Sequence, residues 1–416
     1  MNTSELKKKI LEGGIDSTLC SELSVLPDNV PAQRERYARA VDEFEKLYGD
    51  GDVSLYSVGG RSEISGNHTD HNHGRVIAAA VNLDILAVVK PTGDGTIRIK
   101  SEGFDEDVVP KEAVEAPDKG KFFTSAAIIA GMEKAFLNAG YKIGGFNAAI
   151  ESDIPIGSGV SSSAAFEVLI GRIFNALYNN GSAEPMTIAL AAQYAENAHF
   201  GKPCGLMDQA ACALGGVQFI DFFDNAAPNV SALEWPFTNE FAIYIINTGS
   251  SHADMTDAYA QITADMKSAS DILGADRLGH ADEAEFMRRL GEIRRAAGDR
   301  AAMRALHFFG ENARVSNMAA AIRTADAAAY ARIMRQSAAS SESLLQNIFT
   351  PAQRDKSLAI GIALARRYLD PIGGVARVHG GGFAGTMQAL VPIGAEDGFT
   401  RYMESFFGKA SVIRAI

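Results

Sequence analysis

The chain has 416 residues, of which 47% are hydrophobic and 22% are charged, a composition typical of folded proteins and not of disordered ones. Because single hydrophobic cores stop growing near ~250–300 residues, this length predicts two domains. The net charge of −12 argues against a broad nucleic-acid or anionic-membrane surface, since such partners need a basic face, but it leaves a local basic pocket open.

The amino-terminal segment, MNTSELKKKILEGG, has charged residues where a signal peptide would need an apolar core, and it predicts an amphipathic helix instead. The most apolar run, Val76 to Val89, is interrupted by Asn82 and Asp84 and is shorter than the ~20 residues of a membrane span. The three cysteines show no CxxC spacing, so neither a disulfide framework nor a thiolate zinc site is expected. We therefore expect a cytoplasmic protein with no membrane partner.

The spacing of apolar residues predicts helices over residues 1–50, followed by a strand-rich region. Period-two and β-branched stretches predict strands in VSLYSV, VIAAAVNLDILAVVK, TIRIKS and GGFNAAIESDIP. Helical spacing returns over residues 164–177 and in MTIALAAQYAENAHF, and FAIYIINTG predicts another strand. Residues 259–369 are predicted to be mostly helical, before a glycine-containing, β-prone end. Strands first and helices later predict an α+β protein, with domains at 1–230 and 231–416.

The segment GRSEISGNHTDHNHG, residues 60–74, is polar along its whole length and contains three histidines. One interpretation is a transition-metal site for hydrolysis that uses His68, Asp70, His71 and His73. In an extended chain, alternation would place His71 and His73 on one side and Asp70 on the other, which disfavours a shared ion.

The segment PIGSGVSSSAAFEVLIG, residues 155–171, predicts a strand that runs through two glycines into a helix beginning near Ser162. Glycines allow a ligand close to the backbone, and a helix N-terminus offers unpaired N–H groups, so the arrangement favours phosphate binding. The alternative is a serine-capped helix after a glycine turn. No lysine followed by serine or threonine closes the glycine run, which excludes a Walker A loop.

A G-x-G-x-x-G pattern occurs at Gly380, Gly382 and Gly385, and by itself it would suggest a dinucleotide-binding dehydrogenase. The chain continues from there into β-like TMQALV and ends about 31 residues after Gly385. Because a Rossmann half needs a helix at this point and a longer chain, we disfavour this interpretation.

Several spaced segments resemble one family. GRSEISGNHTDHNHG resembles the galactokinase signature, PIGSGVSSSAA resembles the phosphate loop of the wider GHMP kinase superfamily, and HGGGFAGTMQALV resembles its third glycine motif. AENAHFGKPCGLMDQAACALGG is similar to the galactokinase segment that holds the catalytic aspartate, and two later segments, NTGSSHADMTDAYAQ and RALHFFGENARV, are also similar. The resemblance covers most of the chain from Val53 to Pro392.

This resemblance implies an ATP-dependent sugar 1-kinase with a two-domain GHMP kinase fold. The N-terminal domain would be like the second domain of ribosomal protein S5 and the C-terminal domain ferredoxin-like, with ATP and a small-molecule sugar in the cleft between them. Galactose is the implied substrate, and galactose 1-phosphate and ADP are the implied products. Phosphoryl transfer needs in-line positioning and stabilisation of negative charge, which an arginine and Mg²⁺ can supply.

The resemblance also implies a set of site residues. Asp208 would be the catalytic carboxylate, as a base or as an orienting charge, with Arg61 as its charged partner beside the phosphate. The implied sugar-binding residues are Asn67, His68, Asp70, Gly205 and Tyr259. The implied ATP-binding residues are Gly157, Ser158, Gly159, Ser161, Ser162 and Ser163. Glu196 and a serine of Ser162 and Ser163 would hold Mg²⁺, a hard cation that prefers oxygen ligands.

The signature departs from the family pattern at Asn67, where relatives usually have a glutamate that contacts a sugar hydroxyl. A carboxylate makes hydrogen bonds worth ~1.5–3 kcal/mol, whereas a neutral amide makes bonds nearer ~0.5–1.5 kcal/mol but can also donate. The change predicts weaker binding of galactose and leaves open a related sugar, such as an N-acetylated sugar, a uronic acid or a pentose. A non-catalytic sensor of sugar and ATP is a further alternative, which the presence of both Arg61 and Asp208 disfavours.

Overall fold

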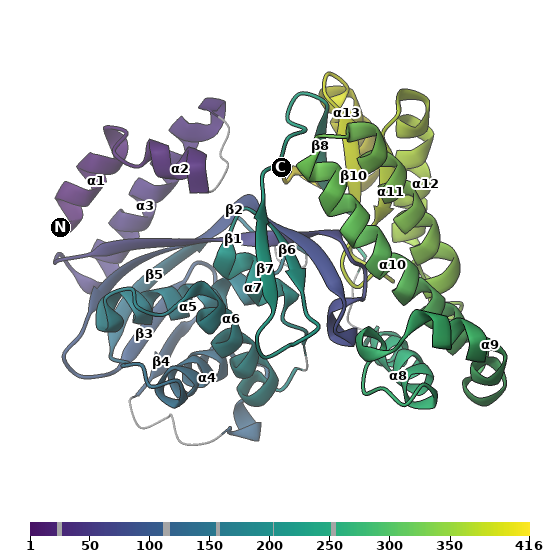
Figure 1. Ribbon diagram of the computed structural model, residues 1–416. Coiled ribbons are helices and arrows are strands. Elements are labelled where there is room, and N and C mark those ends of the chain that lie inside the picture. Colours follow the sequence, from purple (N-terminus) through teal and green to yellow (C-terminus); the bar gives the residue numbers. More distant parts are fainter. Residues whose placement is uncertain (23–26, 111–116, 155–158, 203, 251–254) are drawn as a thin grey trace. The chain divides into compact units, whose positions relative to one another are not determined.

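The structure is a computed structural model, and it describes all residues except 23–26, 111–116, 155–158, 203 and 251–254 (Figure 1). The chain forms two compact units that are interleaved in sequence. Unit 1 comprises Met1–Arg61, Ala80–Ile156 and Val160–Gly215, and unit 2 comprises Ser62–Ala79, Gly157–Gly159 and Gly216–Ile416. The two continuous domains predicted at 1–230 and 231–416 stay a prediction. Each compact unit combines segments from distant parts of the sequence, so the units do not test where a continuous domain would end.

Unit 1 contains a sheet with strand order β4-β3-β5-β2, with β1 also paired to β2. Strands β3 and β5 are parallel, and the pairs β5–β2 and β3–β4 are antiparallel. The strands are β1 (Ser54–Ser65), β2 (Arg75–Pro91), β3 (Ile97–Ser101), β4 (Glu106–Val109) and β5 (Phe146–Ser152). These elements confirm the strands predicted between residues 53 and 155.

Three helices cover one face of this sheet, namely α1 (Thr3–Leu11), α2 (Asp16–Glu22) and α3 (Val30–Tyr48) (Figure 1). Their apolar side chains, Phe44 among them, pack against Leu86 and Val88, which alternation along β2 places on the same face. The helical prediction for residues 1–50 is thereby confirmed over these three segments.

The other helices of unit 1 lie on the opposite face of the sheet (Figure 1). They are α4 (Ser125–Asn138), α5 (Ser162–Asn179), α6 (Pro185–Tyr194) and α7 (Met207–Leu214), and a wider turn, Ala195–Phe200, continues α6. The sequence did not predict α4. Nine of its fourteen residues are buried, so it lacks the polar stripe from which helical periodicity is recognised.

An ion pair explains why the apolar run of β2 is interrupted by a carboxylate. Asp84 is buried and accepts hydrogen bonds from Arg36 and Tyr37 of α3 and from Ser57 of β1. The Tyr37 hydroxyl lies 2.6 Å from the Asp84 carboxylate. Because a buried charge needs a partner, this residue links α3 to the sheet by polar contacts inside an apolar layer.

Unit 2 contains an antiparallel sheet with strand order β11-β8-β10-β9. The strands are β8 (Phe241–Asn247), β9 (Val375–Val378), β10 (Thr386–Pro392) and β11 (Val412–Arg414). Within the same unit, β6 (Val217–Asp221) pairs with residues 75–79 of β2 and with β7 (Asn229–Leu233). The strand predicted in FAIYIINTG is confirmed as β8, and the predicted return to β structure is confirmed as β9 and β10.

The helices of unit 2 are α8 (Thr256–Ile272), α9 (Glu283–Ala297), α10 (Asp299–Arg323), α11 (Ala327–Ser340), α12 (Ser357–Leu369) and α13 (Glu396–Phe407). Helices α12 and α13 pack on the antiparallel sheet through a core that includes Leu369, Met387 and Phe399. The long helical prediction for 259–369 is confirmed. Among the residues that the structure describes, no helix is both long and apolar enough to cross a membrane.

Candidate active site

Arg61 and Asp208 form a two-point ion pair in unit 1. Arg61 lies near the end of β1 and is buried, and Asp208 lies in the first turn of α7 with its side chain about one-third exposed. Two hydrogen bonds of 2.6 Å join Arg61 Nε to Asp208 Oδ1 and Arg61 Nη2 to Asp208 Oδ2. The Ser161 hydroxyl donates a third hydrogen bond to Asp208 Oδ2. Residues far apart in the sequence are therefore brought to one carboxylate.

The surroundings of Asp208 keep it ionised. Burial opposes the charge, but the positive charge of Arg61 and the hydrogen bonds from Arg61 and Ser161 outweigh it, so the pKa of Asp208 is lowered from 3.8. The first turn of a helix also favours a negative charge through its free N–H groups. At neutral pH this side chain is a hydrogen-bond acceptor only.

The end of the predicted phosphate loop precedes α5 directly. Gly157 and Ser158 lie outside the described residues, but Gly159 has a left-handed φ of 71°, and a Cβ there would lie 2.3 Å from Thr386 Oγ1 of the same unit. Ser161 holds the N-cap position of α5 with a φ of 58° and makes no capping hydrogen bond. Because its hydroxyl is bound to Asp208 instead, the alternative of a serine-capped helix does not describe this turn.

A buried cluster of carboxylates lies among α5, the turn after α6, and α7 in unit 1. Glu196 accepts from Lys202 Nζ at 2.9 Å and from Gln209 Nε2 at 2.8 Å, and Gln209 also donates to Glu167 at 3.1 Å. Glu167 Oε1 is buried and has no hydrogen-bond partner among the described residues. Burial, together with the negative charge of Glu196, raises the pKa of Glu167 well above its usual value.

This cluster fits the implied magnesium site. Ser163 and Glu167 are four residues apart on α5 and so share one face of the helix. A divalent cation prefers carboxylate and hydroxyl oxygens, and it would satisfy the unpaired oxygen of Glu167. Glu167 was missed by the sequence analysis, although it follows Ser163 by four residues and so lies on the same face of the predicted helix. The assignment of Ser162, Ser163 and Glu196 to Mg²⁺ stays a prediction.

In unit 2, the galactokinase-like signature and α8 donate hydrogen bonds to successive carbonyl groups of the third glycine motif. Asn67 Nδ2 donates to the Gly380 carbonyl at 2.6 Å, and Tyr259 Oη donates to the Gly382 carbonyl at 2.8 Å. Between them, His68 Nε2 lies 3.0 Å from the Gly381 carbonyl. Three residues predicted for the sugar site thus converge on one glycine loop.

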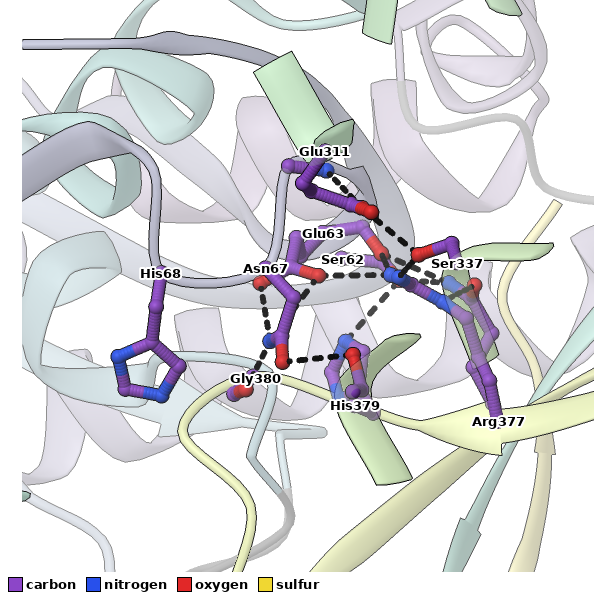
Figure 2. A network of polar contacts seen from close by, with 12 residues as sticks. Ser62, Glu63, Asn67, His68, Glu311, Ser337, Arg377, His379 and Gly380 are labelled. Atoms are coloured by element: carbon purple, nitrogen blue, oxygen red, sulfur yellow. Dashed lines mark hydrogen bonds and ion pairs between the residues drawn. The ribbon is translucent and has the colours of Figure 1, made fainter. Parts of the chain in front are cut away.

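Asn67 is fully buried and its amide is engaged on both sides (Figure 2). Besides Gly380, its nitrogen donates to Glu63 Oε2 at 3.2 Å, and its oxygen accepts from Asn347 Nδ2 at 2.8 Å and from Ser341. A neutral amide can donate to a carboxylate and accept from another amide at the same time, whereas an ionised carboxylate only accepts. The predicted contact between Asn67 and the sugar stays a prediction, and it would be made in addition to these hydrogen bonds within the protein.

Glu63, which Asn67 contacts, forms a buried ion pair with Arg377 of β9 at 2.7 Å (Figure 2). Arg377 also donates to Gln388 at 3.1 Å and to Ser337 at 3.2 Å. Burial raises the pKa of Glu63 although Arg377 and Asn67 oppose that shift. Glu63 was missed by the sequence analysis. Nothing in the signature indicates that Glu63 is buried or that it pairs with Arg377, which lies 314 positions away.

The hydrogen bonds of His68 fix the proton on each of two histidines. His68 donates from Nε2 to the Gly381 carbonyl, so its Nδ1 accepts, and His71 Nε2 lies 3.1 Å from that atom. His71 Nδ1 in turn accepts from Asn72 Nδ2 at 2.9 Å. Burial lowers the pKa of both histidines, and it lowers that of His71 to about 4 with help from Arg277. His71, to which the sequence analysis gave no role, is therefore the neutral support of His68.

The other two residues predicted for the sugar site, Asp70 and Gly205, are both half-buried. Asp70 begins a short 3₁₀ turn, Asp70–Asn72, so this part of the signature is not extended chain. Gly205 is half-buried in unit 1 and lies three residues before Asp208. His379 lies 3.1 Å from Ser62 Oγ and 3.0 Å from Thr386 Oγ1.

Comparisons with known proteins agree with these motifs. The family model for the GHMP kinases N terminal domain matches residues 125–216, and that for the galactokinase galactose-binding signature matches residues 42–91. A galactokinase of Streptomyces coelicolor is 30% identical over 384 residues, which cover 89% of this chain and 93% of that protein. The chain belongs to the galactokinase family of GHMP kinases. A galactokinase of Actinobacillus pleuropneumoniae is 29% identical over 379 residues, with 90% and 94% covered.

Solved structures confirm the predicted GHMP kinase fold of this family member. The crystal structure of Lactococcus lactis galactokinase complexed with galactose has a TM-score of 0.77 at 23% identity and covers 90% of this chain and 96% of that chain. Streptococcus pneumoniae phosphomevalonate kinase in complex with phosphomevalonate and AMPPNP has a TM-score of 0.60 at 13% identity, with 87% and 100% covered. Membership of the family makes the protein a phosphotransferase with an alcohol group as acceptor, and ATP is the substrate of GHMP kinases.

The neutral histidines lead to a prediction for folding stability. Because the unfolded pKa of His71 is about 6.5 and the folded one about 4, the unfolded state binds more protons in this window. Stability should therefore fall as the pH is lowered from about 6.5 to 4, by up to about 1.4 kcal/mol per pH unit for this residue. A His71→Gln variant, whose amide can replace both hydrogen bonds without titrating, should show a shallower fall in urea unfolding at several pH values. The same slope in both proteins would contradict the assignment.

Proposed function

We propose that this protein is a galactokinase, which transfers the γ-phosphate of ATP to the anomeric hydroxyl of galactose and releases galactose 1-phosphate and ADP. The observation that carries the proposal is the ionised Asp208, held by Arg61 and Ser161 next to the start of α5. Family membership and the match to the galactose-binding signature over residues 42–91 support the choice of sugar.

In the proposed step, the anomeric oxygen attacks the γ-phosphorus while the bond from that phosphorus to the β,γ-bridging oxygen breaks, so that ADP leaves. The hydroxyl proton passes to the Asp208 carboxylate, or Asp208 orients the hydroxyl while the proton leaves with product phosphate or solvent. Arg61 serves this step in two ways. It keeps Asp208 ionised, and it places a permanent positive charge where negative charge must be stabilised.

The remaining predicted residues take supporting roles in this proposal. We assign triphosphate binding to the glycine loop and the first turn of α5, because the first N–H groups of a helix are unpaired within it. The residues are Gly157, Ser158, Gly159 and Ser161 of the loop and Ser162 and Ser163 of the helix. A bound Mg²⁺ would neutralise charge on the β- and γ-phosphates. Glu196 and a serine of Ser162 and Ser163 are proposed to hold it, with Glu167 as a further oxygen donor.

Sugar recognition is assigned to Asn67, His68, Asp70, Gly205 and Tyr259. In this proposal, three of these residues also position the loop Gly380–Gly382. Asn67, His68 and Tyr259 each donate a hydrogen bond to one of its carbonyl groups. Hydrogen bonds to these carbonyls restrict the orientation of the intervening peptide planes, which in this proposal orders the loop before substrate binds.

Product analysis tests the proposed function. A coupled assay of ADP release over a panel of sugars, followed by NMR of the product, should find galactose phosphorylated on the anomeric carbon. The panel should include an N-acetylated sugar, a uronic acid and a pentose, since Asn67 replaces the glutamate of the family. Phosphate on another carbon, or no turnover with any sugar, would overturn the proposal.

The chemical role of Asp208 can be separated from substrate binding. An Asp208→Asn variant should lose kcat by ~10²–10⁴ if the carboxylate accepts the proton, because an amide cannot do so. ATP affinity should be retained. A control variant, Asp42→Asn, changes an exposed carboxylate on α3 that pairs with Lys7 at 2.6 Å, and it should behave as wild type. Near-normal kcat in Asp208→Asn would remove this residue from the mechanism.

Asn67 offers a test of how the signature selects its substrate. An Asn67→Glu change restores the family residue but places a second carboxylate against Glu63 and removes the donor to the Gly380 carbonyl. We expect this variant to lose kcat/KM by at least about tenfold with every sugar, since two buried carboxylates repel.

Adding Glu63→Gln to Asn67→Glu should recover part of the loss, because it removes one of the two negative charges. Urea unfolding of both variants reports whether stability follows the same order. If Asn67→Glu alone raises kcat/KM for galactose without loss of stability, residue 67 contacts the sugar directly and its link to Glu63 is secondary.

A further inference from the structure

Two histidines and an aspartate meet at the surface of unit 2, and none of the three is among the residues assigned to phosphoryl transfer. His73 ends the galactokinase-like signature, and Asp276 and His280 lie in the segment between α8 and α9. One ligand atom from each of the three residues lies within 4.8 Å of the others. The whole chain has eight histidines, so the meeting of two of them beside a carboxylate calls for an explanation.

The separation of the two imidazoles matches that of ligands on one metal ion. His73 Nδ1 lies 3.4 Å from His280 Nε2. Two nitrogens at the usual zinc distance of ~2.0–2.1 Å, placed at a tetrahedral angle, lie about 3.3–3.4 Å apart. The rings are nearly perpendicular, with an interplanar angle of 80° and centroids 4.9 Å apart, so they are not stacked against each other.

Asp276 is placed as a support for one of these ligands. Its Oδ1 lies 2.6 Å from His280 Nδ1, which leaves Nε2 as the atom that faces His73. Metal-binding histidines commonly donate their second N–H to a carboxylate, which fixes the ring and makes the ligand nitrogen more basic. His280 Nε2 donates a hydrogen bond to the carbonyl oxygen of Phe223 at 2.7 Å, and a metal ion on Nε2 would replace this hydrogen bond.

The backbone is built to bring the two segments together. A Cβ on Gly279 would lie 2.3 Å from the carbonyl oxygen of His73 and 2.7 Å from that of Asn72, so glycine is required where the 3₁₀ turn Leu278–His280 contacts the signature. His73 itself has a left-handed φ of 60°, a conformation that costs free energy in a non-glycine residue and needs support from its surroundings.

We propose that His73 Nδ1 and His280 Nε2 bind one zinc ion or a similar transition-metal ion, with Asp276 orienting His280 and the Phe223 carbonyl or water completing the coordination. Imidazole ligands select zinc, nickel or copper over magnesium, which prefers oxygen. The proton on His280 Nε2 that now faces Phe223 is released to solvent when the metal–nitrogen bond forms. Such an ion would join the signature turn, the segment 276–280 and residue 223 within unit 2.

Zinc titration of the full, untagged chain tests this site without any measurement of activity. Isothermal titration calorimetry with Zn²⁺ should find one saturable site, and Zn²⁺ should raise the Tm of the protein because it binds the folded state. His73→Gln and His280→Gln should each weaken binding at least about tenfold. Asp276→Asn should weaken it by about 10–100-fold, as expected for a residue that orients a ligand.

Asp271→Asn is the matched control, since it removes an exposed carboxylate near the end of α8 that pairs with Lys267, and it should bind Zn²⁺ as wild type does. Far-ultraviolet circular dichroism confirms that each variant is folded before titration. Absence of saturable Zn²⁺ binding in wild type would overturn the proposal. Equal affinity in wild type and in both histidine variants would also overturn it. Loss of binding only in His71→Gln would overturn it as well, because it would indicate a site at His68 and His71.

Discussion

The ion pair between Arg61 and Asp208 is the constraint on which the proposed chemistry depends. A carboxylate in a confined site tends to take up a proton, and a protonated aspartate could not accept the proton of a sugar hydroxyl. Arg61 opposes that tendency with its positive charge and two hydrogen bonds to Asp208, and the Ser161 hydroxyl donates a third. The geometry requires residue 61 of β1, the turn before α5 and the first turn of α7 to be aligned. Ser161 has a left-handed backbone and leaves α5 without a side-chain cap, since its hydroxyl is bound to Asp208.

Other buried carboxylates in the protein are stabilised by different means. Asp84 remains paired with Arg36 and two hydroxyl groups, and Glu63 is paired with Arg377 and bound by the amide of Asn67. Glu167 lies near Glu196, a residue of like charge, and its pKa is well above its usual value. A bound cation would offset the repulsion between these two carboxylates and lower that pKa. The neutral amide at position 67 fits this pattern, because a glutamate there would add a second charge beside Glu63.

The sequence was sufficient to predict the class of fold, most helices and strands, and the family, because these depend on local periodicity and on motifs with fixed spacing. The pairing of Arg61 with Asp208 was also predicted, since each residue lies in one of these motifs. Glu63, Glu167 and the role of His71 were not predicted. Each depends on which buried group a side chain meets across tens or hundreds of residues, such as Glu63 with Arg377, and neither periodicity nor composition reports such contacts. Helix α4 was missed for a related reason, since burial on most sides removed its periodic signal.

The ionisation of Asp208 can be measured directly by carbon-13 NMR of protein labelled at aspartate carboxyl groups, with the signal assigned by its loss in Asp208→Asn. In wild type, the pKa is lowered from 3.8, so the signal should not titrate between about pH 5 and 8. In Arg61→Met the burial of the carboxyl group is no longer offset by that charge, and its pKa should rise into or toward this range. An Asp208 signal that titrates within it in wild type, or that has the same pKa with and without Arg61, would contradict the account.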